Sequence, residues 1–97
     1  MTWQVMQTRR FARQYKKLHK NTVSDIDDAV EVVSQTPELG TRKKGDLSSL
    51  YVYKFISHGQ EYLLGYTLDE GVNLVYLEAV GSHQKHQGVS QLEKEKD

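Results

Sequence analysis

The sequence contains no cysteine, a single proline (Pro37) and no long run of apolar residues. The lack of cysteine excludes a disulfide scaffold, a zinc ribbon and a thiol nucleophile. No run approaches the roughly 20 apolar residues of a membrane span, and Met-Thr-Trp-Gln at the N-terminus does not resemble a secretory signal. No low-complexity tract indicates general disorder. These absences predict a cytoplasmic protein without a membrane partner.

Net charge is lacking too, because 13 Lys and Arg residues balance 13 Asp and Glu residues. The sum alone argues against a strongly basic nucleic-acid binder. The charges are divided unevenly, however: residues 1–58 hold ten cations and six acids, a net of +4, and residues 59–97 hold three and seven, a net of −4. A cationic face for a polyanion is therefore compatible with overall neutrality.

The 97 residues are enough for one domain of ordinary size. Residues 2–7 alternate loosely and predict a short strand. Thr8 can cap a first helix whose apolar stripe is Phe11, Tyr15 and Leu18. A second helix begins at Asn21 or Thr22 and ends before Pro37. Its apolar stripe consists of Val23, Ile26, Val30 and Val33. We expect the two helices to form an antiparallel hairpin.

The apolar period changes from 3.6 to 2 after a loop over residues 38–49, which predicts strands over residues 50–57, 61–67 and 72–80. In the last strand, Val75, Leu77 and Ala79 share one face. The fold class is therefore α+β, with the order β-α-α-β-β-β and an antiparallel sheet packed against the N-terminal helical hairpin. Residues 1–83 form the single domain, and residues 84–97 are a polar tail that we expect to be frayed or disordered.

Two basic segments are candidates for binding a polyanion. The first helix carries six cations and no acid: Arg9, Arg10, Arg13, Lys16, Lys17 and Lys20. Arg42, Lys43 and Lys44 precede the sheet, and we expect both segments to converge on it. A merely solvated helix face is an equally good interpretation. Tyrosines in the strands can stack on bases, but packing within the sheet explains most of them better. They are Tyr51, Tyr53, Tyr62, Tyr66 and Tyr76.

His83 follows Gly81 and Ser82 at the end of the last strand, where a side chain is well placed for exposure. An imidazole suits general acid–base chemistry at neutral pH, although an inconsequential surface histidine is the commoner case. A metal pair of His83 and His86 is disfavoured because no third ligand has regular spacing. The sequence has no phosphate-binding P-loop and no nucleophile elbow. We therefore predict neither a metal nor a small-molecule cofactor.

Several segments together resemble the RelE/ParE toxin superfamily of bacterial type II toxin–antitoxin systems. They are Trp-Gln-Val near the N-terminus, the helix from Arg9 to Leu18, and four segments around the sheet: Arg-Lys-Lys-Gly-Asp-Leu, Tyr-Val-Tyr-Lys-Phe, Tyr-Leu-Leu-Gly-Tyr and Ala-Val-Gly-Ser-His, starting at residues 42, 51, 62 and 79. The resemblance covers about residues 1–83 and depends on order and spacing. It implies a cytoplasmic toxin neutralised by a cognate antitoxin.

The resemblance further implies a ribosome-dependent mRNA endoribonuclease that needs no metal, in which the RNA's own 2′-hydroxyl attacks the adjacent phosphate. The chain looks closest to the YafQ-like branch, where a histidine at the position of His83 and an acid at that of Glu61 are catalytic. A further histidine of that branch falls near Ser57 or His58. With Lys54, the implied catalytic set is His83, Glu61, Lys54 and His58. The implied RNA contacts are Arg42, Lys43, Lys44, Arg10, Arg13 and Lys17.

The sequence departs from that branch after His83, where no phenylalanine, tyrosine or arginine follows. This departure keeps two alternatives open. One is a ParE-like inhibitor of DNA gyrase without enzymatic activity, and the other is an attenuated toxin that only binds its antitoxin. The fold cannot separate these functions, because one fold hosts several of them.

Overall fold

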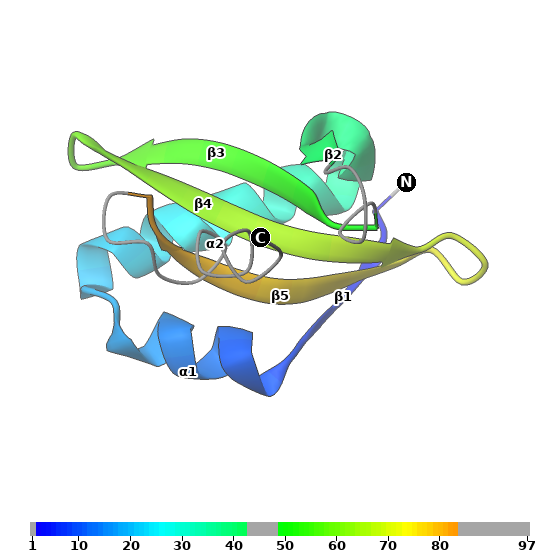
Figure 1. Ribbon diagram of the computed structural model, residues 1–97, viewed down its shortest axis with the longest axis horizontal. Coiled ribbons are helices and arrows are strands. Elements are labelled where there is room, and N and C mark those ends of the chain that lie inside the picture. The colour runs from blue at the N-terminus through cyan, green and yellow to red at the C-terminus, as the bar shows by residue number, and fades with distance from the viewer. Residues whose placement is uncertain (1, 43–48, 84–97) are drawn as a thin grey trace, which may run out of the picture.

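The computed structural model describes residues 2–42 and 49–83 and confirms the α+β class. The tail over residues 84–97 lies outside the described residues, as do Lys43, Lys44 and His86. The elements follow the chain as shown in Figure 1: β1 (Gln4–Gln7), α1 (Arg9–Lys17), α2 (Lys20–Gln35), the 3₁₀ turn η1 (Pro37–Leu39), β2 (Thr41–Arg42), β3 (Tyr51–Ser57), β4 (Gln60–Asp69) and β5 (Leu74–Ser82).

The sheet is mixed, with the strand order β1-β5-β4-β3-β2. The predicted antiparallel meander is present in β3, β4 and β5. The expectation of a wholly antiparallel sheet is wrong, because β1 pairs parallel with β5 in the register Gln4↔Leu74 to Gln7↔Leu77. Alternation of apolar residues predicts that a segment is a strand, but not which strand it pairs with or in which direction. The short strand β2 also forms inside the segment predicted as a loop.

The helix boundaries follow local capping groups. Thr8 caps α1 as predicted, because its Oγ1 accepts a hydrogen bond from the Phe11 N–H at 3.1 Å. The same hydroxyl lies 3.0 Å from the Glu78 carbonyl, so the cap also ties α1 to β5. His19 caps α2 by accepting from the Asn21 N–H, which starts the helix slightly earlier than predicted. Pro37 follows the end of α2, as expected.

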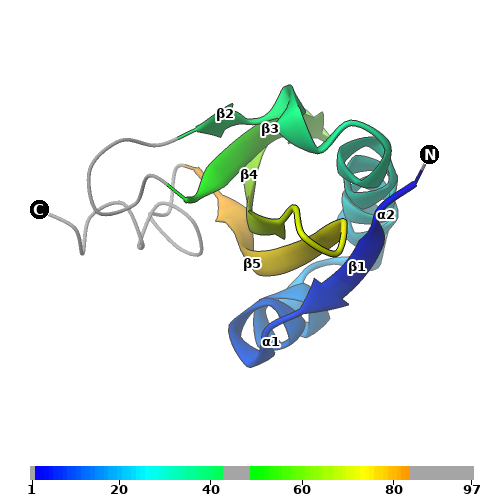
Figure 2. The same cartoon turned by 90° about the vertical axis from the view of Figure 1, so that its right-hand side faces the viewer.

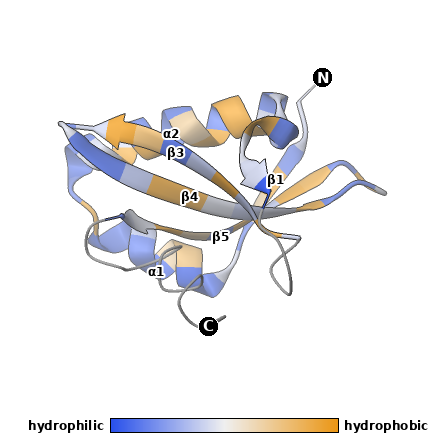
Figure 3. Ribbon diagram, turned by 45° about the horizontal axis from the view of Figure 1, so that its top comes forward, coloured by the Kyte–Doolittle hydropathy of each residue, from blue (hydrophilic) through white to orange (hydrophobic). Residues whose placement is uncertain are grey.

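Both helices cover one face of the sheet, and the other face is free of them (Figures 1 and 2). The main core lies between these layers and consists of Phe11, Ile26, Ala29, Val33, Leu64, Tyr66, Val75, Leu77 and Val80. A smaller buried cluster belongs to the other side of the sheet and consists of Leu50, Val52, Leu63 and Ala79. We call the sheet surface away from the helices the open face. In Figure 3, α1 is coloured mostly hydrophilic, so packing on β5 must supply most of its stability.

A β-bulge alters the predicted facing of β5. Gly65 pairs with Ala79 but Tyr66 pairs with Leu77, which leaves Glu78 as the extra residue. A bulge shifts the alternation of side chains by one position. Ala79 therefore belongs to the open-face cluster and Val80 to the main core, contrary to the predicted grouping of Ala79 with Val75 and Leu77.

The connection between β3 and β4 is a two-residue turn. His58 and Gly59 have positive φ angles of 53° and 79°, and Ser57 pairs with Gln60 across them. Two central residues in the left-handed region define a type I′ hairpin, which fixes the register of both strands. Within residues 2–42 and 49–83, no helix is long and apolar enough to cross a membrane.

Candidate active site on the open sheet face

Glu61 and His83 meet at one end of the open face. Glu61 is the second residue of β4, and His83 directly follows the last residue of β5. The antiparallel register pairs Tyr62 with Ser82, so its continuation places Glu61 and His83 opposite each other. The backbone N–H of His83 donates to the Glu61 carbonyl at 3.1 Å, which extends the ladder by one residue. Sheet geometry therefore brings together two side chains that are 22 residues apart.

The two side chains are in direct contact. Nδ1 of His83 lies 2.8 Å from Oε1 of Glu61, while the imidazole stays 50% and the carboxylate 38% exposed. An ionised carboxylate can only accept, so the contact places the proton of a neutral imidazole on Nδ1. Nε2 is then the acceptor, on an exposed ring. The carboxylate also stabilises the imidazolium that forms when Nε2 takes up a proton.

Lys54 lies on the same face, one row further along the sheet. It pairs with Leu63, two residues after Glu61, so it is a diagonal neighbour of the Glu61–His83 pair. Such diagonal positions remain within reach of long side chains. Lys54 is exposed. The open face therefore presents an acid, an imidazole and an ammonium from three adjacent strands.

The structure separates the two candidates Ser57 and His58. Ser57 is 1% exposed, and its hydroxyl lies 2.6 Å from Oδ2 of Asp25 on α2, so it belongs to the packing of the helix layer. His58 is exposed at the hairpin turn, beside the strand ends that carry Glu61 and His83. Of these two residues, only His58 can contact a large ligand on the open face.

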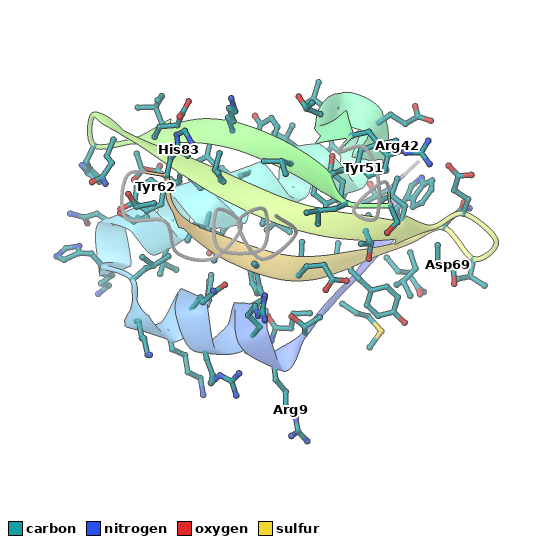
Figure 4. All side chains as sticks on the ribbon, in the orientation of Figure 1. Arg9, Arg42, Tyr51, Tyr62, Asp69 and His83 are labelled. Carbon is teal, nitrogen blue, oxygen red and sulfur yellow. The ribbon has the colours of Figure 1, made fainter. Side chains whose placement is uncertain are left out.

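The basic segments do not converge as expected. The α1 helix packs against β5, where Oε1 of Gln14 accepts a hydrogen bond from the Val80 N–H. The strand order of the sheet places Arg42 on β2, at the edge far from β5. Figure 4 shows Arg9 and Arg42 on different sides of the molecule. The Arg42 guanidinium lies 6.0 Å from the ring centre of Tyr51. Arg42 therefore lies apart from the cations of α1.

The tyrosines mostly pack within the helix-covered layer, as the structural interpretation predicted. Tyr66 is fully buried, and its ring stacks on Tyr51 at 5.5 Å. Tyr62 stacks on Phe55, and Tyr53 packs against the main core. Tyr76 pairs with Thr67 near the far end of β4 and β5. It lines an open hollow of about 510 Å³ with Tyr51 and Arg42.

A metal site has no support in the described part of the chain. Among residues 2–42 and 49–83, no three His, Asp or Glu side chains are grouped so that they could hold a metal ion.

Comparisons with known proteins identify the family of the chain. The model of the ParE-like toxins of type II bacterial toxin–antitoxin systems matches residues 5–87. A search of curated proteins finds no match. Similar solved structures include the RelBE2 toxin–antitoxin complex of Mycobacterium tuberculosis, at 20% identity and a TM-score of 0.72, covering 84% of this chain and 99% of that one.

The RelBE toxin–antitoxin complex of E. coli is similar too, at 20% identity and a TM-score of 0.68, covering 81% of this chain and 94% of that one. The archaeal RelE–RelB complex of Pyrococcus horikoshii is more distant, at 15% identity and a TM-score of 0.58, covering 84% and 96% of the two chains. At such identities the structures support the fold alone. The family model matches most of the chain, and the chain therefore belongs to the RelE/ParE superfamily, among the ParE-like toxins of type II toxin–antitoxin systems.

Proposed function

We propose that this toxin is a ribosome-dependent mRNA endoribonuclease. The observation that carries the proposal is the exposed Glu61–His83 pair, whose atoms lie 2.8 Å apart on the open face. A toxin that only binds a protein target does not require a carboxylate to orient an exposed imidazole. A nuclease that uses the RNA's own 2′-hydroxyl requires a proton acceptor, because that hydroxyl must lose its proton, and an oriented imidazole can serve as that acceptor.

The proposed step begins when Nε2 of His83 takes the proton of the 2′-hydroxyl. The 2′-oxygen forms a bond to phosphorus, and the bond from phosphorus to the 5′-oxygen breaks. The products are a 2′,3′-cyclic phosphate and a 5′-hydroxyl, so no water is consumed. Glu61 holds the Nδ1–H tautomer and stabilises the imidazolium, as the carboxylate of a catalytic triad does.

The remaining groups supply charge and the second proton. We assign to Lys54, which lies one row from the pair, the stabilisation of the negative charge that develops on the phosphoryl oxygens. The leaving 5′-oxygen lies opposite the attacking oxygen in an in-line displacement, so His83 cannot reach both. We assign its protonation to His58, which is exposed at the adjacent hairpin turn.

An antitoxin is the proposed protein partner. The E. coli and M. tuberculosis relatives were solved as toxin–antitoxin complexes. The ribosome and its message are the proposed substrate assembly. The six exposed cations of α1 and its flanks provide a surface for ribosomal RNA, since no ion pair with an acid is recorded for them among the described residues.

The test is cleavage of a message on programmed ribosomes, followed by mapping of the cut ends. The wild-type protein should cut the message and leave a cyclic phosphate. His83→Ala should reduce the rate by roughly 10²–10⁴-fold, the usual contribution of a positioned general base. Glu61→Gln should reduce it less, because the amide can still hold the ring but not the imidazolium charge.

Matched controls separate chemistry from folding. His19→Asn removes an exposed histidine while keeping a side chain that can cap α2, and Glu70→Gln neutralises an exposed carboxylate in the far turn. Both should cut like the wild type. Equal cleavage by His83→Ala and the wild type would falsify the assignment of the base. Expression without antitoxin should arrest growth for the wild type and not for His83→Ala.

A second candidate function is inhibition of DNA gyrase without catalysis. The observation in its favour is that the matching family model describes ParE-like toxins. The discriminating assay is gyrase supercoiling with stoichiometric protein. Inhibition that His83→Ala retains, together with an intact message on programmed ribosomes, would replace the nuclease by the gyrase inhibitor.

A further inference from the structure

The catalytic pair proposed above lies where a sheet is least constrained. Glu61 is the second residue of β4, and His83 lies one residue beyond the end of β5. Strand ends open more readily than strand centres. Both side chains are also exposed, so neighbouring side chains do not enclose them. A contact of 2.8 Å between their ends therefore depends on whatever holds the two strand ends together.

A second side-chain bond joins the same strand ends on the opposite face of the sheet. Nε2 of Gln60 donates to Oγ of Ser82. Gln60 precedes Glu61 and Ser82 precedes His83, so alternation along each strand turns this bond away from the open face. Ser82 is only 6% exposed. The bond is therefore shielded and makes no contact with a ligand on the open face.

The Gln60–Ser82 bond is itself anchored to the helix layer. Gln60 pairs with Ser57 across the hairpin. The hydroxyl of Ser57 lies 2.6 Å from Asp25 and 3.2 Å from Thr22, both on α2. The beginning of β4 is thus fixed to a helix, and through Gln60 the end of β5 is fixed to the beginning of β4.

We infer that Gln60 is a positioning residue that holds His83 against Glu61 through its hydrogen bond to Ser82. The inference builds on the proposed function. It assigns Gln60 no contact with RNA and no proton transfer. The bond restrains the backbone immediately before His83, and the His83 N–H to Glu61 carbonyl bond transmits that restraint to the imidazole. Without the bond, the end of β5 loses a tether and the ring samples positions away from the carboxylate.

The test combines a spectroscopic and a kinetic measurement on the full chain. The first readout is the tautomer of His83 from imidazole ¹⁵N chemical shifts, which needs no RNA. The wild type should hold the neutral ring as the Nδ1–H tautomer. Gln60→Ala and Ser82→Ala should each mix the two tautomers, and the double variant should add nothing, because both substitutions remove one interaction. Gln4→Ala, an exposed glutamine on β1, is the matched control.

The second readout is message cleavage on programmed ribosomes. Gln60→Ala should lower kcat by roughly tenfold, since small displacements of a catalytic group are costly, and should leave KM unchanged. Gln60→Glu should restore kcat, because its carboxylate can accept from the Ser82 hydroxyl. An unchanged Nδ1–H tautomer in Gln60→Ala overturns the inference, and so does a tautomer change of equal size in Gln4→Ala. A tautomer change with full cleavage supports the positioning role and counts against the proposed catalytic role of His83.

Discussion

The hydroxyl of Tyr66 fixes the connection that leads from α2 into the sheet. Tyr66 is fully buried, its Oη donates to the Pro37 carbonyl at 2.7 Å, and the same oxygen accepts from the Gly40 N–H at 2.9 Å. The substitution Tyr66→Phe removes only this oxygen. The ring keeps its place and its stacking on Tyr51, so no cavity as large as a side chain opens.

The cost of Tyr66→Phe follows from the two groups that lose their partner. The hydrogen bond of the Gly40 N–H is only part-buried, and its loss costs about 1 kcal/mol. The Pro37 carbonyl belongs to a buried residue, and leaving it unsatisfied costs about 1–3 kcal/mol. The free energy of unfolding should therefore fall by about 2–4 kcal/mol. For a chain of this size, that lowers Tm by about 8 °C or more.

The assay is urea denaturation followed by circular dichroism and by the fluorescence of Trp3, which packs against the main core. Tyr76→Phe is the control, because Tyr76 is part-exposed and its hydroxyl has no recorded partner among the described residues. Its unfolding free energy should stay within about 0.5 kcal/mol of the wild type. A loss below about 0.5 kcal/mol in Tyr66→Phe would refute the argument.

Three further predictions concern pH, backbone space and charge. Burial raises the pKa of Tyr66 above 10.0, so on raising the pH the unfolded chain loses this proton before the folded chain does. The free energy of unfolding should therefore keep its full value below about pH 10 and fall above it. Alkaline denaturation should show a less steep fall in Tyr66→Phe. Gly40→Ala should lower the free energy of unfolding, measured in urea, by about 1–3 kcal/mol, because the added Cβ would lie 2.5 Å from Tyr66 Oη. In Gly59→Ala the added Cβ meets no other atom, and the positive φ angle alone should lower the free energy of unfolding by about 1 kcal/mol. Lys54→Met should slow message cleavage on programmed ribosomes by at least tenfold with unchanged stability, and equal rates would exclude Lys54 from the site.

The residues of the candidate active site differ in how far the sequence alone identifies them. His83 carries a local signal in the sequence, because it follows glycine and serine at the end of a predicted strand. Glu61 had no such signal, and only the family resemblance pointed to it. The antiparallel register of β4 and β5 explains why the two belong together. Gln60 and Ser82 had no signal of any kind, because a glutamine and a serine 22 residues apart are individually unremarkable.

The basic residues likewise differ in what the sequence alone predicts about them and what the fold shows. The basic character of the first helix is evident from the sequence, although only five of the six cations lie in α1, because Lys20 is the first residue of α2. The sequence also suggests that both basic segments converge on the sheet. The strand order instead places Arg42 on β2, at the edge far from β5 and α1. If the ribosome binds both Arg42 and the cations of α1, these residues must contact RNA on different sides of the molecule (Figure 4). Binding at either side should weaken steeply as salt rises.

Local sequence signals are sufficient to specify the helices and most of the strands of this protein. Thr8 caps α1, Pro37 follows α2, and alternating apolar residues make β3, β4 and β5, because capping and periodicity act over a few residues. Tertiary structure decided the parallel pairing of β1, the bulge at Glu78 and the contact between Glu61 and His83. These features depend on which strands become neighbours and in which register, and residues far apart in the chain settle that only when they pack together.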